Sequence, residues 1–295
     1  MPPPFPGRFA FLPRRSRAKP ASRPRLWFHA LLACALPLLL LLPQSSGQGT
    51  ARDVARGRGI DASDWSLDPE LPHDVFTFVR LRHNSGWATD FPNSDLNFSF
   101  RLQELTSLEV DPDGRVIDVG SHLLFDYPFV FMSNPHDLDL SVREAENLRA
   151  YLLNGGFLMV DDFWGNRMWE VFTREMQKVL PGQKPRELGF DHAIFHCVFD
   201  LEKIPQVPSH DAAERGRELG YTYEDTIQEP PENLDTPHFM AWHDQNGRMI
   251  VLACHNNDIA DAWEEEGYQH WFFKEFSERW SYPIGINILF YAMTH

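Results

Sequence analysis

The stretch FVFMSNPHDLDLSVREAENLRAYLLNGGFLMVDD, residues 129–162, decides the fold. It begins with the continuous apolar run 129–132, which is typical of a strand buried on both faces of a parallel sheet. Ser141 and Glu144 then form a capping box, in which each side chain accepts a hydrogen bond from a free N–H group at a helix start. The NGG triplet ends that helix, and the apolar FLMV after it is a second buried strand. This order of strand, helix and strand predicts a right-handed βαβ crossover.

The residues around this crossover predict one α/β domain over 75–295. We expect a flavodoxin-like, mostly parallel sheet with helices on both of its faces. Further strands are expected where β-branched and aromatic residues cluster: 75–81, 108–110 and 116–119. The apolar runs 239–242 and 249–253, joined by a QNG turn, predict a hairpin at the edge of the sheet. Helical patterns occupy four more segments: 95–105, 167–179, 269–278 and 284–293.

Two segments depart from this alternation of strands and helices. Residues 203–237 hold five prolines, eight acidic residues and few large apolar side chains. This composition indicates an acidic, proline-rich insertion or lid outside the core. Residues 48–74 combine glycines, arginines and prolines without apolar periodicity, so we expect a flexible linker there.

The formal net charge of −15 divides unevenly along the chain. Residues 1–47 carry seven basic and no acidic side chains, whereas the other 248 residues carry 20 basic and 42 acidic ones. A body with a net charge of −22 repels a phosphate backbone, so we expect no nucleic-acid partner. With 43% hydrophobic and 13% aromatic residues, the chain is also too apolar to be disordered.

Residues 1–47 have the organisation of a signal peptide. An arginine-rich leader precedes the apolar run 31–42, which is shorter than the roughly 20 residues of a membrane-spanning helix. Small residues follow at 45–47, so we expect export to the periplasm with cleavage before Gln48. The alternative is an uncleaved N-terminal anchor that holds the body at the outer face of the inner membrane. In both cases the chain meets the membrane only through this segment.

Cleavage would leave two cysteines, Cys197 and Cys254, far apart in the sequence. Two such residues do not make a disulfide framework. An oxidising compartment permits one bridge between them, but we expect buried free thiols.

The segment 127–162 resembles the class I glutamine amidotransferase-like fold, in its trehalose-utilisation branch. The resemblance extends over nearly all of 75–295 through smaller motifs: Phe78-x-Arg80-Leu81 with Trp87, Asp191-His192-x-Ile194-Phe195, Gly247-Arg248-x-Ile250-Val251 and Gly285-x-Asn287. Together these motifs are similar to those of a bacterial family of unknown function within that superfamily. The resemblance implies an exported or membrane-anchored protein, linked to envelope gene clusters of the MoxR–Bat type, and it implies no particular reaction.

The main departure from true amidotransferases follows the predicted strand 157–160. Those enzymes carry a nucleophilic Cys on a strained turn at this point, whereas this chain has Asp161 and Asp162. A carboxylate cannot replace a thiolate in that chemistry, so we expect no glutamine hydrolysis. Cys197 and Cys254 belong to predicted strands or their ends, where thiols usually serve only as packing.

Three polar groups are expected at the carboxyl ends of strands, where open parallel sheets bind ligands. They are Asn134 with His136, Asp161 with Asp162, and the run from His255 to Asp258. Carboxylates and imidazoles gathered there could bind a divalent cation or act as acid and base. The alternative is that Asp161 or Asp162 caps the helix that begins near Gly165, and that Asp258 caps the next one.

Three further candidates have a functional and a purely structural interpretation. Arg80 could hold an anionic ligand, or it could pair with one of the many acids. Trp87 could stack on a sugar ring, or it could pack in the core. His192, beside Asp191, could transfer a proton, or it could form a hydrogen bond at the start of a strand. The run Glu264-Glu265-Glu266 indicates a solvated helix face.

The leading hypothesis is a non-catalytic module of the bacterial cell envelope that binds an envelope protein, a small molecule or a carbohydrate. Its pocket would be lined by Asp161, Asp162, His192, His255 and Asp258, with Arg80 and Trp87 at the rim and Asn134 and His136 nearby. The alternative is a hydrolase of carbohydrate or cell-wall material that uses an aspartate as base or metal ligand and a histidine as its partner. The chain has no Cys-x-x-Cys spacing, and we predict no cofactor; a divalent metal at the aspartates stays an open alternative.

Overall fold

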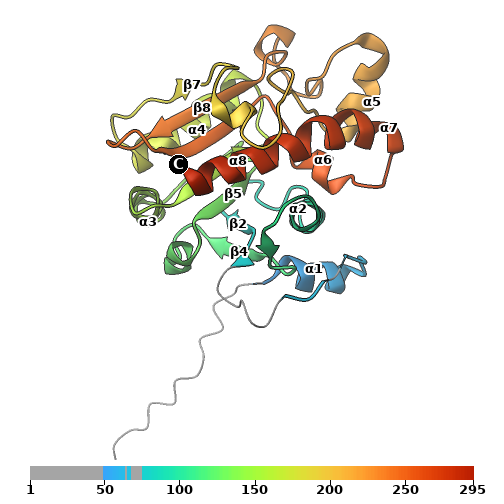
Figure 1. Cartoon of the computed structure of the whole chain (residues 1–295). Coiled ribbons are helices and arrows are strands. Elements are labelled where there is room, and N and C mark those ends of the chain that lie inside the picture. Colours follow the sequence, from blue (N-terminus) through green and yellow to red (C-terminus); the bar gives the residue numbers. More distant parts are fainter. Residues whose placement is uncertain (1–48, 64, 68–74) are drawn as a thin grey trace, which may run out of the picture. The chain divides into compact units, whose positions relative to one another are not determined.

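The domain is built on a central sheet of seven described strands: β2 (Val79–Arg82), β4 (Arg115–Asp118), β5 (Phe129–Ser133), β6 (Phe157–Asp161), β7 (Arg186–Glu187), β8 (His238–His243) and β9 (Met249–His255). The computed structural model describes residues 49–63, 65–67 and 75–295. Within this part the strand order is β4-β2-β5-β6-β9-β8-β7, and all pairs from β4 to β9 are parallel (Figure 1). β8 and β7 then add two antiparallel pairs. The predicted α/β class with a mostly parallel sheet is therefore confirmed.

The predicted βαβ crossover forms as the sequence indicated. β5 and β6 pair in parallel along their whole length, and every residue of both strands is buried. Between them lies α3 (Val142–Leu153), which begins with the capping box of Ser141 and Glu144. The local signals and the burial pattern agree at this point, which is why the stretch predicts its own structure.

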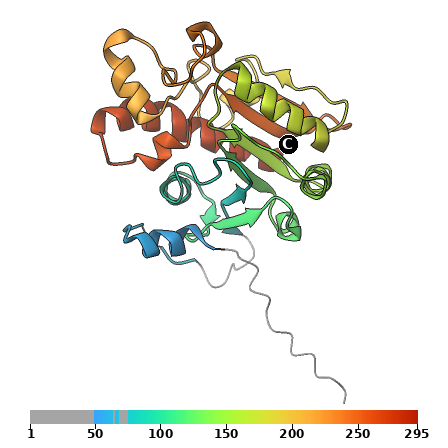
Figure 2. The ribbon, with the colours of Figure 1, turned by 180° about the vertical axis from the view of Figure 1, so that it is seen from behind.

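Helices cover both faces of the sheet, because side chains of a strand alternate between its two faces. On one face, α2 (Asn93–Leu105) and α8 (Tyr282–Thr294) pack on an aromatic cluster that includes Phe131 and Phe157. On the other face, α3 and α4 (Gly165–Val179) pack on an aliphatic cluster that includes Val130 and Leu158. Figure 2 shows this second face, turned away from the viewer in Figure 1.

The remaining described elements are short: α1 (Ala51–Arg58), β1 (Val75–Phe76), β3 (Glu109–Val110), α5 (His210–Leu219), α6 (Asp261–Glu264), α7 (His270–Phe272), the 3-10 turns η1 (His122–Asp126), η2 (Ala193–Phe195) and η3 (Pro231–Asn233), and the π-helical η4 (Phe273–Ser281). β1 and β3 form a small parallel pair of their own, so the predicted strand 75–81 is divided between β1 and β2. The two predicted C-terminal helices form one run from α7 through η4 to α8. Pro283 is the second residue of α8 and lies inside this continuous run, where it has no N–H group to donate to the helix.

The hairpin of β8 and β9 corrects one expectation, since it does not lie at the sheet edge. β9 pairs with β6 on its other side, and β7 covers the outer side of β8. All residues of β9 are buried, which requires a neighbouring strand on each side and a layer on each face.

Two segments hold more structure than their composition indicated. In 48–74, where we expected a linker, α1 buries Ala51 and Ala55 against the domain. In 203–237, the expectation of a segment outside the core is wrong for Val207 and Leu234, which are almost fully buried. Average composition conceals such isolated apolar anchors.

The predicted signal segment, residues 1–47, lies outside the described residues. Among the helices that the structure does describe, none combines the length and the apolar character needed to cross a membrane.

The sheet topology places the candidate site. β4 and β5 flank β2 on opposite sides, so the chain reverses its direction across the sheet between β2 and β5. Such a switch point leaves a crevice at the carboxyl ends of the strands, which is where open α/β sheets bind ligands. The loops after β2, β5, β6 and β9 all emerge at this edge, because these strands are parallel.

Candidate functional site

The backbone turns sharply where these loops leave the sheet. Among the described residues, four other than glycine have positive φ, namely Asp90 (62°), Asn134 (49°), Asp162 (58°) and Asn256 (57°). This left-handed region is unfavourable for most side chains, and Asn and Asp tolerate it best. The turn at Asp162 joins β6 directly to α4, so its side chain stands at the carboxyl edge of the central strand.

Three aspartates from three of these loops meet at the edge. One carboxylate oxygen from each of Asp90, Asp162 and Asp258 lies within 4.8 Å of the other two. The side chains are buried, with exposed fractions of 8%, 8% and 5%. Asp90 follows β2, Asp162 follows β6 and Asp258 follows β9, so the parallel sheet itself brings them together. We call this group the inner triad.

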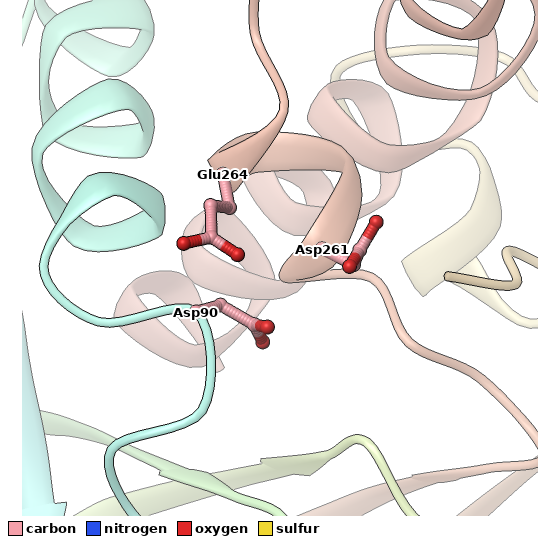
Figure 3. A group of neighbouring side chains, drawn as sticks. All are labelled: Asp90, Asp261 and Glu264. Carbon is pink, nitrogen blue, oxygen red and sulfur yellow. The ribbon is translucent and has the colours of Figure 1, made fainter. Parts of the chain in front are cut away.

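A second group adjoins the inner triad and shares Asp90 with it. Oxygens of Asp90, Asp261 and Glu264 also lie within 4.8 Å of one another, and Figure 3 shows the three carboxyl groups around one space. Asp261 and Glu264 begin and end the short helix α6. Their side chains are only partly buried, so this outer group lies nearer to solvent than the inner triad. Neither group contains a histidine.

Burial disfavours the charged form of these carboxylates and of the adjacent Asp161. It raises the pKa of Asp90 to about 8 and that of Asp161 to about 7. The pKa values of Asp162 and Asp258 also lie well above the ordinary range, first because of burial and then because of the neighbouring aspartates. The Oδ2 atoms of Asp90 and Asp162 have no hydrogen-bond partner among the described residues. A buried oxygen in this state is costly unless it takes up a proton or binds a cation.

The metal-free protein should therefore lose stability as the pH rises from about 4 through neutral to about 8. The folded state retains protons on Asp90 and Asp161 that the unfolded chain, with carboxyl pKa values near 4, has already released. This stability is complete below pH 4 and is lost between pH 4 and the folded-state values, by about 1.4 kcal/mol per pH unit for each proton, so that Asp90 still contributes to the loss between pH 7 and 8. His83 and His255, whose pKa values burial lowers to about 4, act in the opposite direction, but only below about pH 6.5.

Urea unfolding in the presence of EDTA isolates the carboxylate effect between pH 7 and 8.5. We expect the free energy of unfolding to fall over this interval, and we expect Asp90→Asn to flatten the fall because it removes one of the titrating groups. A free energy of unfolding that stays constant or rises between pH 7 and 8.5 would contradict the assigned protonation.

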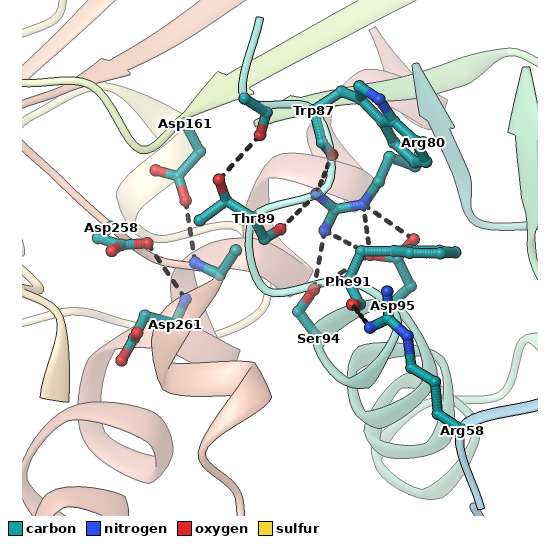
Figure 4. A network of polar contacts seen from close by, with 12 residues as sticks. Arg58, Arg80, Trp87, Thr89, Phe91, Ser94, Asp95, Asp161, Asp258 and Asp261 are labelled. Atoms are coloured by element: carbon teal, nitrogen blue, oxygen red, sulfur yellow. Dashed lines mark hydrogen bonds and ion pairs between the residues drawn. The ribbon is translucent and has the colours of Figure 1, made fainter. Parts of the chain in front are cut away.

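Arg80 does not face this site as a free cation. Its side chain is fully buried, and all five N–H groups have partners (Figure 4). Asp95 accepts from Nε at 2.9 Å and from Nη2 at 2.6 Å, and the Ser94 hydroxyl accepts from Nη2 at 2.8 Å. The carbonyl groups of Trp87 and Thr89 accept from Nη1 at 3.0 and 2.9 Å. The structure thus favours the alternative that Arg80 pairs with an acid, and it gives Arg80 the role of holding the loop that carries Asp90.

The capping interpretation is right for one aspartate only. Asp258 Oδ1 accepts from the N–H group of Asp261 at 3.2 Å and so caps α6. Asp161 Oδ2 accepts from the N–H group of Ala260 at 2.9 Å, and neither Asp161 nor Asp162 caps α4. The first N–H group of α4, that of Gly165, instead donates to Asn256 Oδ1 at 2.9 Å, and the next two, at 166 and 167, donate to the carboxylate of Glu229 at 2.8 and 2.9 Å.

The two candidate histidines lie in other surroundings. His255 Nε2 is 2.9 Å from the carbonyl oxygen of Gly165, and its ring stacks on His238 with centroids 5.7 Å apart. These two rings and Trp169 line a separate cavity of about 220 Å³. His192 caps η2 through its ring nitrogen, which accepts from the N–H group of Ile194.

The remaining candidates, Asn134, His136 and Trp87, pack around the loop that carries Asp90. Asn134 Oδ1 lies 2.5 Å from Nδ1 of His136, and Asn134 Nδ2 donates to the Thr89 hydroxyl at 3.3 Å. The half-buried Trp87 packs against Phe91, with ring centroids 5.6 Å apart. These contacts fix the loop on both sides of Asp90.

The two cysteines of the described part are both free. Cys254 is buried as expected, whereas Cys197 is exposed. The expectation of burial is wrong for Cys197 because the residue lies in the irregular segment after η2 and not in a strand.

Three members of the two groups were not predicted from the sequence. Asp90 lies eight residues beyond β2 in a loop without a recognisable motif, and Asp261 and Glu264 looked like parts of an ordinary polar helix. A usable signal existed for Asp90, since a loop after the first strand of a flavodoxin-like sheet borders the switch point. No comparable signal marks Glu264 among its acidic neighbours.

The fold and the site define an α/β protein with a flavodoxin-like strand order and buried carboxylates at the switch point. The chain belongs to the family described as domain of unknown function (DUF4159), which matches residues 77–293. No curated protein matches the chain.

Proposed function

We propose that the chain is an exported binding module of the bacterial cell envelope whose site binds a divalent cation through the inner triad. The proposed cation rests on one observation. Asp90, Asp162 and Asp258 converge in a buried place, and Asp90 and Asp162 each have an oxygen without a hydrogen-bond partner among the described residues. Export and the envelope setting rest on the N-terminal sequence and on the resemblance to exported amidotransferase-like proteins.

The donor set selects a class of cation. Carboxylate oxygens without thiolates or imidazoles suit hard cations such as Mg²⁺, Mn²⁺ and Ca²⁺. Calcium binds oxygens at about 2.4 Å, so two ligands on opposite sides of one ion stand about 4.8 Å apart. The oxygens of the inner triad fall within that separation. Waters and a ligand oxygen would complete the coordination.

A binding role accounts for the site better than acid–base catalysis. Acid–base hydrolysis by an aspartate and a histidine needs an imidazole beside the aspartates, but His255 lies against His238 and Trp169, and His192 lies at η2. A cation in the inner triad would instead join the loops after β2, β6 and β9. Those loops form the rim of the switch-point crevice, so the cation would fix the surface that a ligand or an envelope protein contacts.

A metal-dependent hydrolase of carbohydrate or cell-wall material is the second candidate. Asp162 favours it, because its φ of 58° places it on a sharp turn from β6 to α4, where the resembled enzymes carry their nucleophile. A cation held there could activate a water molecule without a histidine. Release of reducing ends from cell-wall polysaccharide that requires the cation and disappears in Asp162→Asn would support this candidate over the binding module.

Thermal unfolding of the full chain tests the cation. After treatment with EDTA, titration with Ca²⁺, Mg²⁺ or Mn²⁺ should raise Tm, because a ligand at 100 times its Kd stabilises the folded state by about 2.7 kcal/mol. For a domain of this size that corresponds to a rise of about 5–10 °C. If none of the three cations changes Tm at millimolar concentration, the proposed cation site is incorrect.

A further inference from the structure

We infer that the carboxylate edge binds two divalent cations, with Asp90 as the bridging ligand between an inner and an outer position. This inference rests on the proposed cation site and goes beyond it. The inner position is the triad Asp90, Asp162 and Asp258, and the outer position is the group Asp90, Asp261 and Glu264. Each cation would be a hard one, such as Mg²⁺ or Mn²⁺, because every donor is a carboxylate oxygen.

The inference of a second cation depends on Asp90, which the two groups share. Asp90 is the one residue that belongs to both groups, and a carboxylate has two oxygens that can bind two different ions. Asp90 is only 8% exposed, and its Oδ2 atom has no hydrogen-bond partner among the described residues. An unpartnered oxygen between two groups of carboxylates is in the position of a bridging ligand. Bridged ions in such centres lie about 3.5–4 Å apart.

The number of carboxylates in the cluster is also large enough to hold more than one cation. The two positions together contain five carboxylates, and none of them forms a salt bridge within the described part of the chain. The guanidinium groups of Arg58 and Arg80 are engaged by other residues, as Figure 4 shows. Arg58 donates to the carbonyl group of Phe91 at 2.8 Å, and Arg80 is saturated by Asp95 and its neighbours. One divalent cation would balance two of the five charges, and two would balance four.

The two positions differ in access. The inner carboxylates are almost fully buried, whereas Asp261 and Glu264 are only partly so. Oδ2 of Asp261 also accepts a hydrogen bond from the backbone N–H group of His210 at 2.7 Å, and this bond fixes the carboxylate at the start of α6. The inner cation would thus be enclosed, and the outer cation would keep water ligands that an oxygen-donor ligand can replace.

Electron paramagnetic resonance of the full chain loaded with Mn²⁺ distinguishes the outcomes, together with metal analysis after desalting. We expect two Mn²⁺ per chain and the spectrum of an exchange-coupled pair. Glu264→Gln should remove the outer ion, leaving one Mn²⁺ and an uncoupled spectrum. Glu265→Gln is the matched control, because the adjacent Glu265 belongs to neither group, and it should retain the coupled pair.

The possible results separate this inference from the proposed function. One Mn²⁺ per chain that Glu264→Gln does not affect would overturn the second position and leave the inner site intact. Two uncoupled ions would overturn the bridging role of Asp90. No bound Mn²⁺ would overturn both proposals. Asp261→Asn gives a second test of the outer position should Glu264→Gln fold poorly, and it should likewise leave one ion.

Discussion

Replacement of Asp162 by asparagine is expected to lower the affinity for a divalent cation at least about 100-fold. Loss of a supporting residue around a metal costs 10- to 100-fold, and loss of a charged ligand should cost no less. Asparagine keeps the size of the side chain and tolerates the positive φ of this position, so the turn between β6 and α4 should persist. Calorimetric titration with Mn²⁺ measures the change in Kd.

The same substitution should make the metal-free protein more stable at pH 8. It removes a buried carboxylate whose pKa is raised by burial and by Asp90, and hence the cost of ionising that group in the folded state. Asp126→Asn, at an exposed position, is the control and should change neither quantity. A purely structural Asp162 would show the reverse pattern, with stability lost and cation affinity unchanged.

Replacement of Arg80 by methionine is expected to destabilise the protein by about 3–5 kcal/mol, because it leaves the carboxylate of Asp95 buried without its partner. For a domain of this size, such a loss lowers Tm by about 6–20 °C. The substitution also frees the carbonyl groups of Trp87 and Thr89 that hold the Asp90 loop. Cation affinity should therefore fall as well, in contrast to a substitution that only weakens the core.

Two further variants test the cause of this loss. Arg279→Met breaks two exposed ion pairs, with Glu202 and Glu275, in which the three side chains are 49%, 77% and 57% exposed, and should cost no more than about 1 kcal/mol. The double variant Arg80→Met/Asp95→Leu removes both buried charges and should recover much of the lost stability. Urea unfolding measures all three. If the double variant is no more stable than Arg80→Met alone, the buried charge is not the cause.

The parallel core of the fold was predictable because its signals are local. The capping box at Ser141 and the apolar runs of β5 and β6 each identify an element within a few residues. The position of β9 was harder to predict, since the pairing of a hairpin with β6 depends on contacts far apart in the sequence. Sequence periodicity indicates that a strand is buried, but it does not identify the neighbouring strand.

The candidate site was predictable only in part, for the same reason. Asp162 and Asp258 follow predicted strands, and the rule for carboxyl ends brought them together. Asp90 joins them through a loop that the buried Arg80 holds, and no local pattern shows which partner such an arginine has. His255 was misplaced as a neighbour of the aspartates because it is the last residue of β9, and its side chain points to the face that carries Trp169.

The most direct test of the cation site is the anomalous scattering of a crystal of the protein grown with Mn²⁺. The account predicts an anomalous difference peak enclosed by the carboxylates of Asp90, Asp162 and Asp258. The absence of a peak there, with the three side chains hydrogen-bonded to one another as carboxylic acids, would contradict it. The buried charge would then be neutralised by protons, and the carboxyl edge would not be a cation site.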